Sequence, residues 1–128
     1  MQNDKIDYNE VNLIILGVSS DLKAVEAIDG VDLKSKLIEK DLLIDVRKKN
    51  EIEQGMIEGS QWIELINLEK EHAKLDKNRR YFVMCASGVR SLIGISILQK
   101  LGFEKLVNVM GGFPKAKESG INIIKPHI

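Results

Sequence analysis

The chain of 128 residues contains a single cysteine, Cys85, and only two histidines, His72 and His127. One cysteine excludes an internal disulfide framework, a Cys-x-x-Cys redox pair and a cysteine-rich zinc site. The two histidines are isolated from each other and from Cys85 in the sequence, so no residue pattern predicts a metal site or a bound cofactor. An unpaired cysteine is typical of a protein that works in a reducing compartment.

An excess of charge of either sign is also absent, because nineteen basic and nineteen acidic residues cancel. This balance argues against nucleic-acid binding driven by bulk charge. Long apolar runs are missing as well, since the run over residues 13–18 is far too short to span a bilayer. Residues 1–5 do not resemble the basic start of an export signal. We therefore expect a soluble cytoplasmic protein that binds neither nucleic acid nor membranes.

What the sequence does contain is an ordinary globular composition, with 44% apolar and 30% charged residues. One domain of this length can bury a core without disulfides or metal ions. Apolar segments of strand length alternate with helical patterns, which predicts an α/β fold with a parallel central sheet and helices on both faces. Strands are expected over residues 24–28, 42–47, 61–65, 81–85 and 106–110, and helices over 31–40, 48–54, 67–74, 91–101 and 113–119.

Two of these segments carry a more detailed expectation. The polar helix over residues 67–74 is expected to be exposed and to begin at Asn67, whose side chain can cap it. Residues 1–28 are interpreted as an N-terminal extension of unclear role, followed by one domain over 29–128. The apolar run over 11–18 fits either a buried strand or part of a helix, because periodicity cannot separate the two in so short a run. The extension either packs on the domain or pairs with a second subunit, which leaves a homodimer open.

The most informative stretch is the one around the single cysteine. The apolar run over 81–84 is typical of a strand, and a buried-looking helix follows Cys85 and ends at Gly102. Cys85 is therefore expected between a strand and a helix, where backbone N–H groups lack partners and the helix dipole favours negative charge. A thiolate, the reactive form of cysteine, needs such a place. Gly88 can adopt a positive φ, and the charge of Arg90 either binds an oxyanion or braces the loop.

Position alone does not make a cysteine reactive, because most lone cysteines are small buried hydrophobes. The residues that follow it are more specific. The pattern Cys-x-x-Gly-x-Arg-Ser between strand and helix resembles the active-site loop of rhodanese-family sulfurtransferases. The resemblance implies a rhodanese-like fold, in which Cys85 is the catalytic nucleophile. It also implies a substrate-binding cradle made by Ala86, Ser87, Gly88, Val89, Arg90 and Ser91.

Three further segments resemble blocks of the same family in the same order, so that the resemblance covers about residues 31–123. Leu43-Ile44-Asp45-Val46-Arg47 resembles the first block, and Glu51, Gly55, Ile57, Gly59 and Ser60 match the second. Gly111 and Gly112 resemble the glycine pair near the end of the domain. Three departures are Met56, where histidine is usual, Ser60, where alanine is usual, and Ala116, where tryptophan is usual.

Some of the matched residues have a supporting role under this interpretation. In parallel α/β folds, functional sites lie at the carboxyl ends of strands. Arg47, Cys85 and Gly111 are all expected at such ends. We therefore interpret Asp45, Arg47, Gly111 and Gly112 as framework residues that fix the end of the sheet near the cysteine.

The resemblance implies a sulfurtransferase of the thiosulfate sulfurtransferase type, in the EC 2.8.1 class. Cys85 takes sulfane sulfur from a donor such as thiosulfate as a persulfide and passes it to a thiol or to a protein acceptor. Because the chain has no second cysteine, the acceptor must come from outside. No basic side chain stands next to Cys85, where Ala86 follows, and this predicts slow turnover with the doubly charged thiosulfate.

Two alternatives compete with this interpretation. Phosphatases and arsenate reductases of related fold also use a cysteine and an arginine, but their loop is longer, because a phosphate group needs a wider cradle than one sulfur atom. Only residues 86–89 separate Cys85 from Arg90, which disfavours that class. The second alternative stays open. It is a non-catalytic or carrier rhodanese-like module that binds a protein partner.

Overall fold

The structure is a computed structural model that describes residues 25–127. The extension expected over residues 1–28, with its apolar run, therefore lies almost wholly outside the described residues. Any pairing of that segment with a second subunit lies outside them too. Residues 26–28 form most of the first described strand, so the sheet begins slightly before the domain boundary expected at residue 29.

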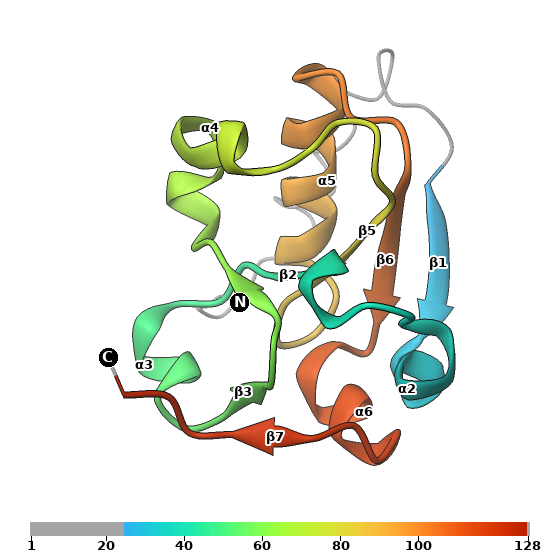
Figure 1. The fold of residues 1–128 in the computed structure, drawn as a ribbon, viewed down its shortest axis with the longest axis vertical. Helices are drawn as coiled ribbons and strands as arrows, with labels where there is room; N and C mark the ends of the chain where they lie inside the picture. The colour runs from blue at the N-terminus through green and yellow to red at the C-terminus, as the bar shows by residue number, and fades with distance from the viewer. Residues whose placement is uncertain (1–24, 128) are drawn as a thin grey trace.

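The described chain alternates between short strands and helices, as the sequence predicts (Figure 1). The strands are β1 (Glu26–Asp29), β2 (Leu43–Asp45), β3 (Met56–Ile57), β4 (Gln61–Trp62), β5 (Tyr81–Met84), β6 (Leu106–Met110) and β7 (Ile123–Ile124). The α-helices are α2 (Leu33–Lys36), α3 (Lys49–Ile52), α4 (Leu68–Glu71), α5 (Arg90–Lys100) and α6 (Gly112–Glu118). Four 3-10 turns complete the set: η1 (Gly30–Asp32), η2 (Lys40–Leu42), η3 (Leu65–Asn67) and η4 (His72–Lys74).

A five-stranded parallel sheet forms the centre of the described domain. Its strand order is β1-β6-β5-β2-β4, so β5, which leads to Cys85, is the middle strand and has β6 and β2 as neighbours. All four residues of β5 are buried, as expected for a central strand covered on both faces. The predicted α/β fold with a parallel central sheet is confirmed. A separate antiparallel pair joins β3 to β7 near the C-terminal end.

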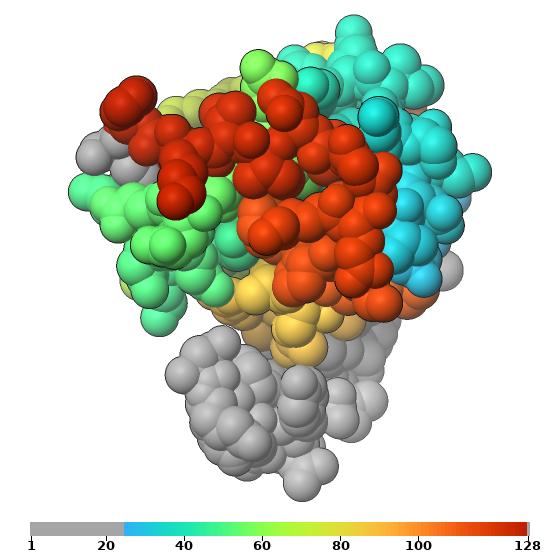
Figure 2. All heavy atoms as spheres, turned by 90° about the horizontal axis from the view of Figure 1, so that it is seen from below, coloured from blue at the N-terminus to red at the C-terminus, as the bar shows by residue number. Residues whose placement is uncertain are grey.

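Alternating side chains of the strands feed two hydrophobic clusters, one on each face of the sheet. Val83 and Cys85 point to the face covered by α4 and α5, and Phe82 and Met84 point to the face covered by α2 and α6. Figure 1 shows these helix pairs on opposite sides of the strands. In Figure 2 the C-terminal segment from α6 to β7 lies between the segment around α2 and the segment around α3.

Two helices differ from the sequence-based expectation. The helix expected over residues 31–40 is reduced to η1 and α2, because Leu37 adopts an extended conformation that ends it. The helix expected over 67–74 is split into α4 and η4, and the side chain of Asn67 makes no capping hydrogen bond. Asn67 already ends the 3-10 turn η3, so it does not have the extended backbone that an N-cap residue needs. The helix is also not fully exposed, since Leu68 is completely buried beside α5.

Within residues 25–127, no helix is both long enough and apolar enough to cross a membrane.

The core on the α5 face supplies a test of the fold. Phe103 is among the largest fully buried side chains and meets Tyr81 edge-on, with ring centroids 6.3 Å apart. We expect Phe103→Ala to lower the free energy of unfolding by about 3–5 kcal/mol, because it leaves a cavity that the surrounding side chains cannot fill. Urea denaturation measures this value. Ile38, which is 91% exposed, is the matched control, and Ile38→Ala should change stability by no more than about 0.5 kcal/mol.

Candidate functional site

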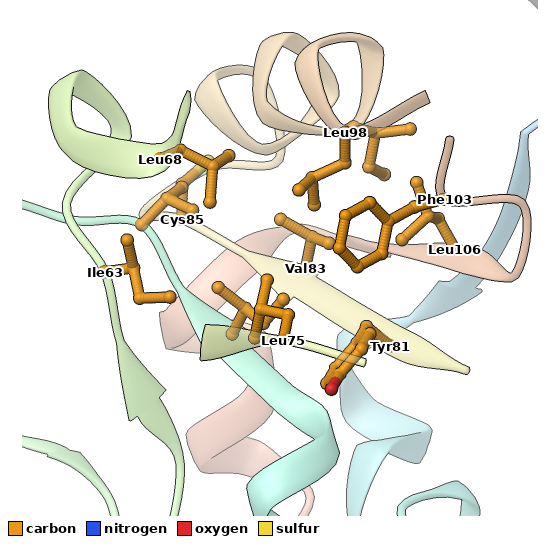
Figure 3. Packing of buried hydrophobic residues seen from close by; sticks show 12 residues of the cluster. Ile63, Leu68, Leu75, Tyr81, Val83, Cys85, Leu98, Phe103 and Leu106 are labelled. Atoms are coloured by element: carbon orange, nitrogen blue, oxygen red, sulfur yellow. The ribbon is translucent and has the colours of Figure 1, made fainter. Parts of the chain in front are cut away.

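Cys85 lies immediately after β5 and is completely buried. The alternation of β5 turns its side chain toward α5, at the end of the core cluster where Ile63 and Leu68 also lie (Figure 3). Tyr81 and Phe103 lie at the other end of this cluster in the same view. The sulfur is therefore in contact with apolar packing on one side and with the following loop on the other.

The loop after Cys85 bends back over the sulfur. The backbone N–H of Gly88 donates a hydrogen bond to Cys85 Sγ, with the nitrogen 3.0 Å from the sulfur. Gly88 adopts a φ of +99°, a left-handed backbone conformation that residues other than glycine rarely adopt. Ser87 is the exposed tip of the loop, while Ala86 and Val89 are half-buried. Among the six residues expected to form the cradle, Gly88 supplies the backbone contact with the sulfur.

Helix α5 begins at Arg90, so the sulfur lies close to the amino-terminal end of a helix of eleven residues. Ser91, in the first turn, is completely buried, and its Oγ lies 3.5 Å from Cys85 Sγ. Two features here favour negative charge near the sulfur, the Gly88 N–H and the positive end of the α5 dipole, while the Ser91 hydroxyl accepts a hydrogen bond from the thiol. Such an arrangement can stabilise negative charge on a thiolate or on a persulfide.

The guanidinium of Arg90 is directed to Glu51 of α3. Arg90 Nη1 and Nη2 each donate to one carboxylate oxygen of Glu51 over 2.8 Å, which is the bidentate geometry of a strong arginine–carboxylate pair. These hydrogen bonds lower the pKa of the Glu51 carboxyl, against the opposing effect of burial, and the Lys48 N–H adds to the lowering. Of the two roles that the sequence leaves open for Arg90, the structure displays the bracing one, since the side chain joins the loop to α3.

Asp45 and Arg47 form a buried ion pair at the carboxyl end of β2. The Arg47 guanidinium donates to both carboxylate oxygens of Asp45 and also to the carbonyl oxygen of Gly55. Its carbon Cζ lies 3.9 Å from the centre of the Phe113 ring. One side chain therefore links β2 to the segment before β3 and to α6. None of these contacts involves the sulfur of Cys85, which agrees with a framework role.

The glycine pair of residues 111–112 lets α6 approach the cysteine. Gly112 has a φ of +64°, and a Cβ atom placed on it would lie 2.5 Å from the carbonyl oxygen of Cys85. That same oxygen accepts a hydrogen bond of 2.9 Å from the N–H of Phe113. The start of α6 is thus in direct contact with the peptide group of Cys85, and any side chain at residue 112 would push the two apart.

Two residues near the cysteine received no role from the sequence. The sequence matches Glu51 to a family block but indicates no partner for it. Arg90, to which Glu51 is hydrogen-bonded, lies 39 positions later in the chain. Asn108, in the middle of β6, is buried and accepts a hydrogen bond of 2.6 Å from Ser91 Oγ. A polar residue inside the apolar segment Leu106-Val107-Asn108-Val109 was the available signal, because an amide inside a central strand needs partners.

A pocket of about 210 Å³ adjoins the loop on the outside. Its walls are mainly apolar, and Lys48 lies at its rim; the lining residues are Val46, Lys48, Glu64, Leu65, Ile66 and Arg90. No group of three or more histidine, cysteine or acidic side chains within the described part of the chain has the arrangement of a metal site.

Comparison with known proteins places this geometry in a family. The family model of the rhodanese-like domain matches residues 30–119, which is most of the chain. The chain belongs to the rhodanese-like domain family. This result confirms the family resemblance drawn from the four sequence blocks. The rhodanese-like domain begins, in this match, one residue after the end of β1.

Individual relatives agree with the family assignment. The chain is 38% identical over 91 residues to the putative sulfurtransferase YtwF of Bacillus subtilis, covering 69% of this chain and 86% of the relative. It is 29% identical over 104 residues to a sulfurtransferase of Allochromatium vinosum, covering 80% and 97% of the two chains. The fold is similar to that of a rhodanese-related protein from Thermoplasma volcanium. That comparison gives a TM-score of 0.69 at 28% identity and covers 79% of this chain and 99% of the other.

The contact between Gly112 and the rhodanese-like loop gives a second test. Gly112→Ala should destabilise the protein by clearly more than the ~1–2 kcal/mol that a left-handed alanine costs, because it adds a steric clash with the Cys85–Ala86 backbone. Gly120 also has a positive φ, of +87°, but a Cβ atom there would make only ordinary contact with the Lys34 side chain, 3.8 Å away, so Gly120→Ala should show the conformational cost alone. Thermal unfolding of both variants measures the difference. Equal losses of stability would contradict a clash at residue 112.

The Arg90–Glu51 pair predicts a pH dependence of stability. Because the pKa of Glu51 is lowered by folding, its contribution is fully present above the pKa of the unfolded chain and is lost as the pH falls through the folded value. Wild-type protein should therefore lose this contribution below the ordinary glutamate pKa of about 4.3. Thermal unfolding midpoints of wild type and Glu51→Gln should converge on acidification. A difference between the two unfolding midpoints that stays constant at all pH values would argue against the Arg90–Glu51 pair as the source of that difference.

Proposed function

We propose that the chain is a sulfurtransferase that moves sulfane sulfur from a thiosulfate-like donor to a thiol or protein acceptor through a persulfide on Cys85. The observation that carries the proposal is the hydrogen bond from the Gly88 N–H to Cys85 Sγ, in a loop that ends at the start of α5. Membership in the rhodanese-like family and relatives named sulfurtransferases support it. An unpaired cysteine fits a reducing compartment, and we propose the cytoplasm as the place of the activity.

The first half-reaction forms the persulfide. The Cys85 thiolate attacks the outer sulfur of the donor, and its electron pair makes the new S–S bond. The donor's own S–S bond breaks, and the electron pair of that bond leaves with sulfite. The negative charge now lies on the outer sulfur of the persulfide, where backbone N–H groups of the loop and the amino-terminal end of α5 stabilise it, as preorganised dipoles do for developing charge in other enzymes.

The second half-reaction returns the enzyme to its starting state. A thiolate of the acceptor attacks the outer sulfur, and the pair of electrons in the Cys85 S–S bond goes back to Sγ as the thiolate. The acceptor leaves as a persulfide. The apolar walls of the pocket beside Arg90 suit an organic thiol or a protein side chain better than an inorganic dianion.

Donor preference follows from the charges around the loop. The Arg90 charge is balanced by Glu51, and Ala86 adds no cation next to Cys85. Attraction for doubly charged thiosulfate therefore depends on backbone dipoles, which supports slow turnover with that donor. A phosphatase activity is disfavoured by the same pairing, because phosphate binding by such loops needs the arginine fork that Glu51 occupies here.

A persulfide carrier is the second candidate, and the complete burial of Cys85 favours it. A donor must displace part of the loop to reach the buried sulfur, and a partner protein that docks on the loop provides more binding energy for that movement than a small anion does. The carrier and the enzyme share the persulfide, and they differ in donor and in turnover.

Intact mass spectrometry tests the proposal. After incubation with excess thiosulfate, wild-type protein should gain one sulfur atom (~32 Da), as expected for an activated thiolate. Cyanide should remove this mass, and Cys85→Ser should not acquire it. Turnover with thiosulfate then separates an enzyme from a carrier. If neither thiosulfate, mercaptopyruvate nor a protein persulfide produces the adduct, the sulfurtransferase proposal is wrong and a partner-binding module takes its place.

A further inference from the structure

A chain of buried hydrogen bonds extends from the sulfur of Cys85 to β6. Ser91 Oγ lies 3.5 Å from Cys85 Sγ and 2.6 Å from Asn108 Oδ1. Asn108 Nδ2 lies 3.4 Å from the carbonyl oxygen of Gly88, in the loop that covers the sulfur. Ser91 is completely buried and Asn108 is 4% exposed, so water does not compete for these groups.

The sheet brings these groups together. Asn108 shares the α5-facing side of β6 with Leu106, because side chains alternate along the strand. β6 is the direct neighbour of β5, which ends just before Cys85. The first turn of α5 places Ser91 over this edge of the sheet, between the cysteine and the amide.

The carbonyl oxygen of Gly88 decides which way the amide of Asn108 faces. An amide presents two N–H donors on its nitrogen and only acceptor sites on its oxygen. If the amide were reversed, its oxygen would face the Gly88 carbonyl and two acceptors would lie against each other. Nδ2 therefore faces Gly88, and Oδ1 faces Ser91.

This orientation fixes the proton of Ser91. A serine hydroxyl has one hydrogen to donate, and Asn108 Oδ1 can only accept it. With its hydrogen directed to Asn108, Ser91 Oγ presents lone pairs toward Cys85 Sγ. The hydroxyl therefore accepts a hydrogen bond from the Cys85 thiol and cannot at the same time donate one to the thiolate.

We infer that Asn108 is a positioning residue that acts through Ser91. Because Asn108 holds the Ser91 proton, negative charge is less favourable on Cys85 Sγ than on the outer sulfur of a persulfide. The part of this inference that concerns the persulfide rests on the proposed function. In the persulfide Sγ is a neutral sulfur with two covalent bonds, which needs no donor, so the Ser91–Asn108 hydrogen bond remains intact. When the acceptor removes the outer sulfur, the Gly88 N–H is the one hydrogen-bond donor to the returning thiolate among residues 25–127. A thiolate that is less stabilised is a stronger nucleophile for the next donor.

Charged side chains around this network do not override the effect. Asp45 is paired with Arg47 at the end of β2, and Glu51 of α3 is paired with Arg90 at the start of α5. Each carboxylate is balanced by an arginine. The direction of the Ser91 proton is therefore an influence on the charge of the sulfur that these two ion pairs do not cancel.

Ionisation of Cys85 tests this inference without sulfur transfer. The ultraviolet absorbance of the thiolate and the rate of alkylation by iodoacetamide, each followed against pH, give the pH midpoint for the appearance of the thiolate. Asn108→Leu has nearly the shape of asparagine but removes the acceptor, which frees the Ser91 proton to donate to the sulfur. We expect its midpoint to fall by about one pH unit, a tenfold change in the thiol–thiolate ratio.

A double-mutant comparison separates positioning from a structural effect. In a Ser91→Ala background, Asn108→Leu should leave the midpoint unchanged, because no hydroxyl remains to be reoriented. Asn108→Ala should behave in the same way as Asn108→Leu, and it replaces the leucine variant if circular dichroism shows that leucine disturbs the fold. Equal shifts with and without the Ser91 hydroxyl, or no shift in either, would overturn the inference.

The two proposals can fail separately. A midpoint that responds to Asn108 only when Ser91 is present supports the positioning role even if no donor forms a persulfide. Persulfide loading by mass spectrometry, with unchanged midpoints in the Asn108 variants, supports the sulfurtransferase function and refutes the role of Asn108.

Discussion

The arrangement of the site depends on one buried ion pair, between Asp45 and Arg47. Removing two charges from water is unfavourable, and the cost is offset here by hydrogen bonds from the guanidinium to both carboxylate oxygens and to the Gly55 carbonyl, together with packing on Phe113. The pair holds the end of β2, the segment before β3 and the start of α6 in one place. Phe113 then donates its N–H to the carbonyl oxygen of Cys85, so the position of Cys85 depends on this ion pair as well.

A second layer of contacts surrounds the loop and sets its chemistry. Glu51 balances the charge of Arg90 and fastens the loop to α3, while Gly88 and Ser91 face the sulfur directly. The loop is therefore held from both sides, and the charge next to the sulfur is close to neutral except for backbone dipoles. A site of this kind suits a single negative sulfur atom better than a free dianion. Under the proposed mechanism, the features that favour a persulfide therefore also disfavour tight binding of thiosulfate.

Much of the fold could be predicted from local patterns. Apolar runs marked the strands that became β2, β5 and β6, and the position of Cys85 between a strand and a helix followed from residues 81–102 alone. Local patterns failed where a distant contact decides the outcome. The 3-10 turn before α4 removed Asn67 from its expected capping role, and burial of Leu68 depends on packing against α5.

The same limit applies to the candidate site. The direction of the Arg90 side chain depends on Glu51, which lies 39 positions earlier, and the surroundings of Ser91 depend on Asn108, 17 positions later. Neither partner can be chosen from spacing, because the sequence does not state which strand lies next to which. The pairing of β6 with β5, once known, places Asn108 opposite Val83, within reach of Ser91 and Gly88.

The contact between Cys85 and the start of α6 has a consequence for synthesis of the protein. A chain leaves the ribosome from its N-terminus, so Cys85 and its loop emerge before β6 and α6 are free to dock. Until then the carbonyl oxygen of Cys85 lacks the Phe113 N–H, and the middle strand β5 lacks one of its two neighbours. The thiol of the nascent protein is therefore held by fewer contacts than in the folded domain, and its surroundings are completed only when β6 and α6 have docked.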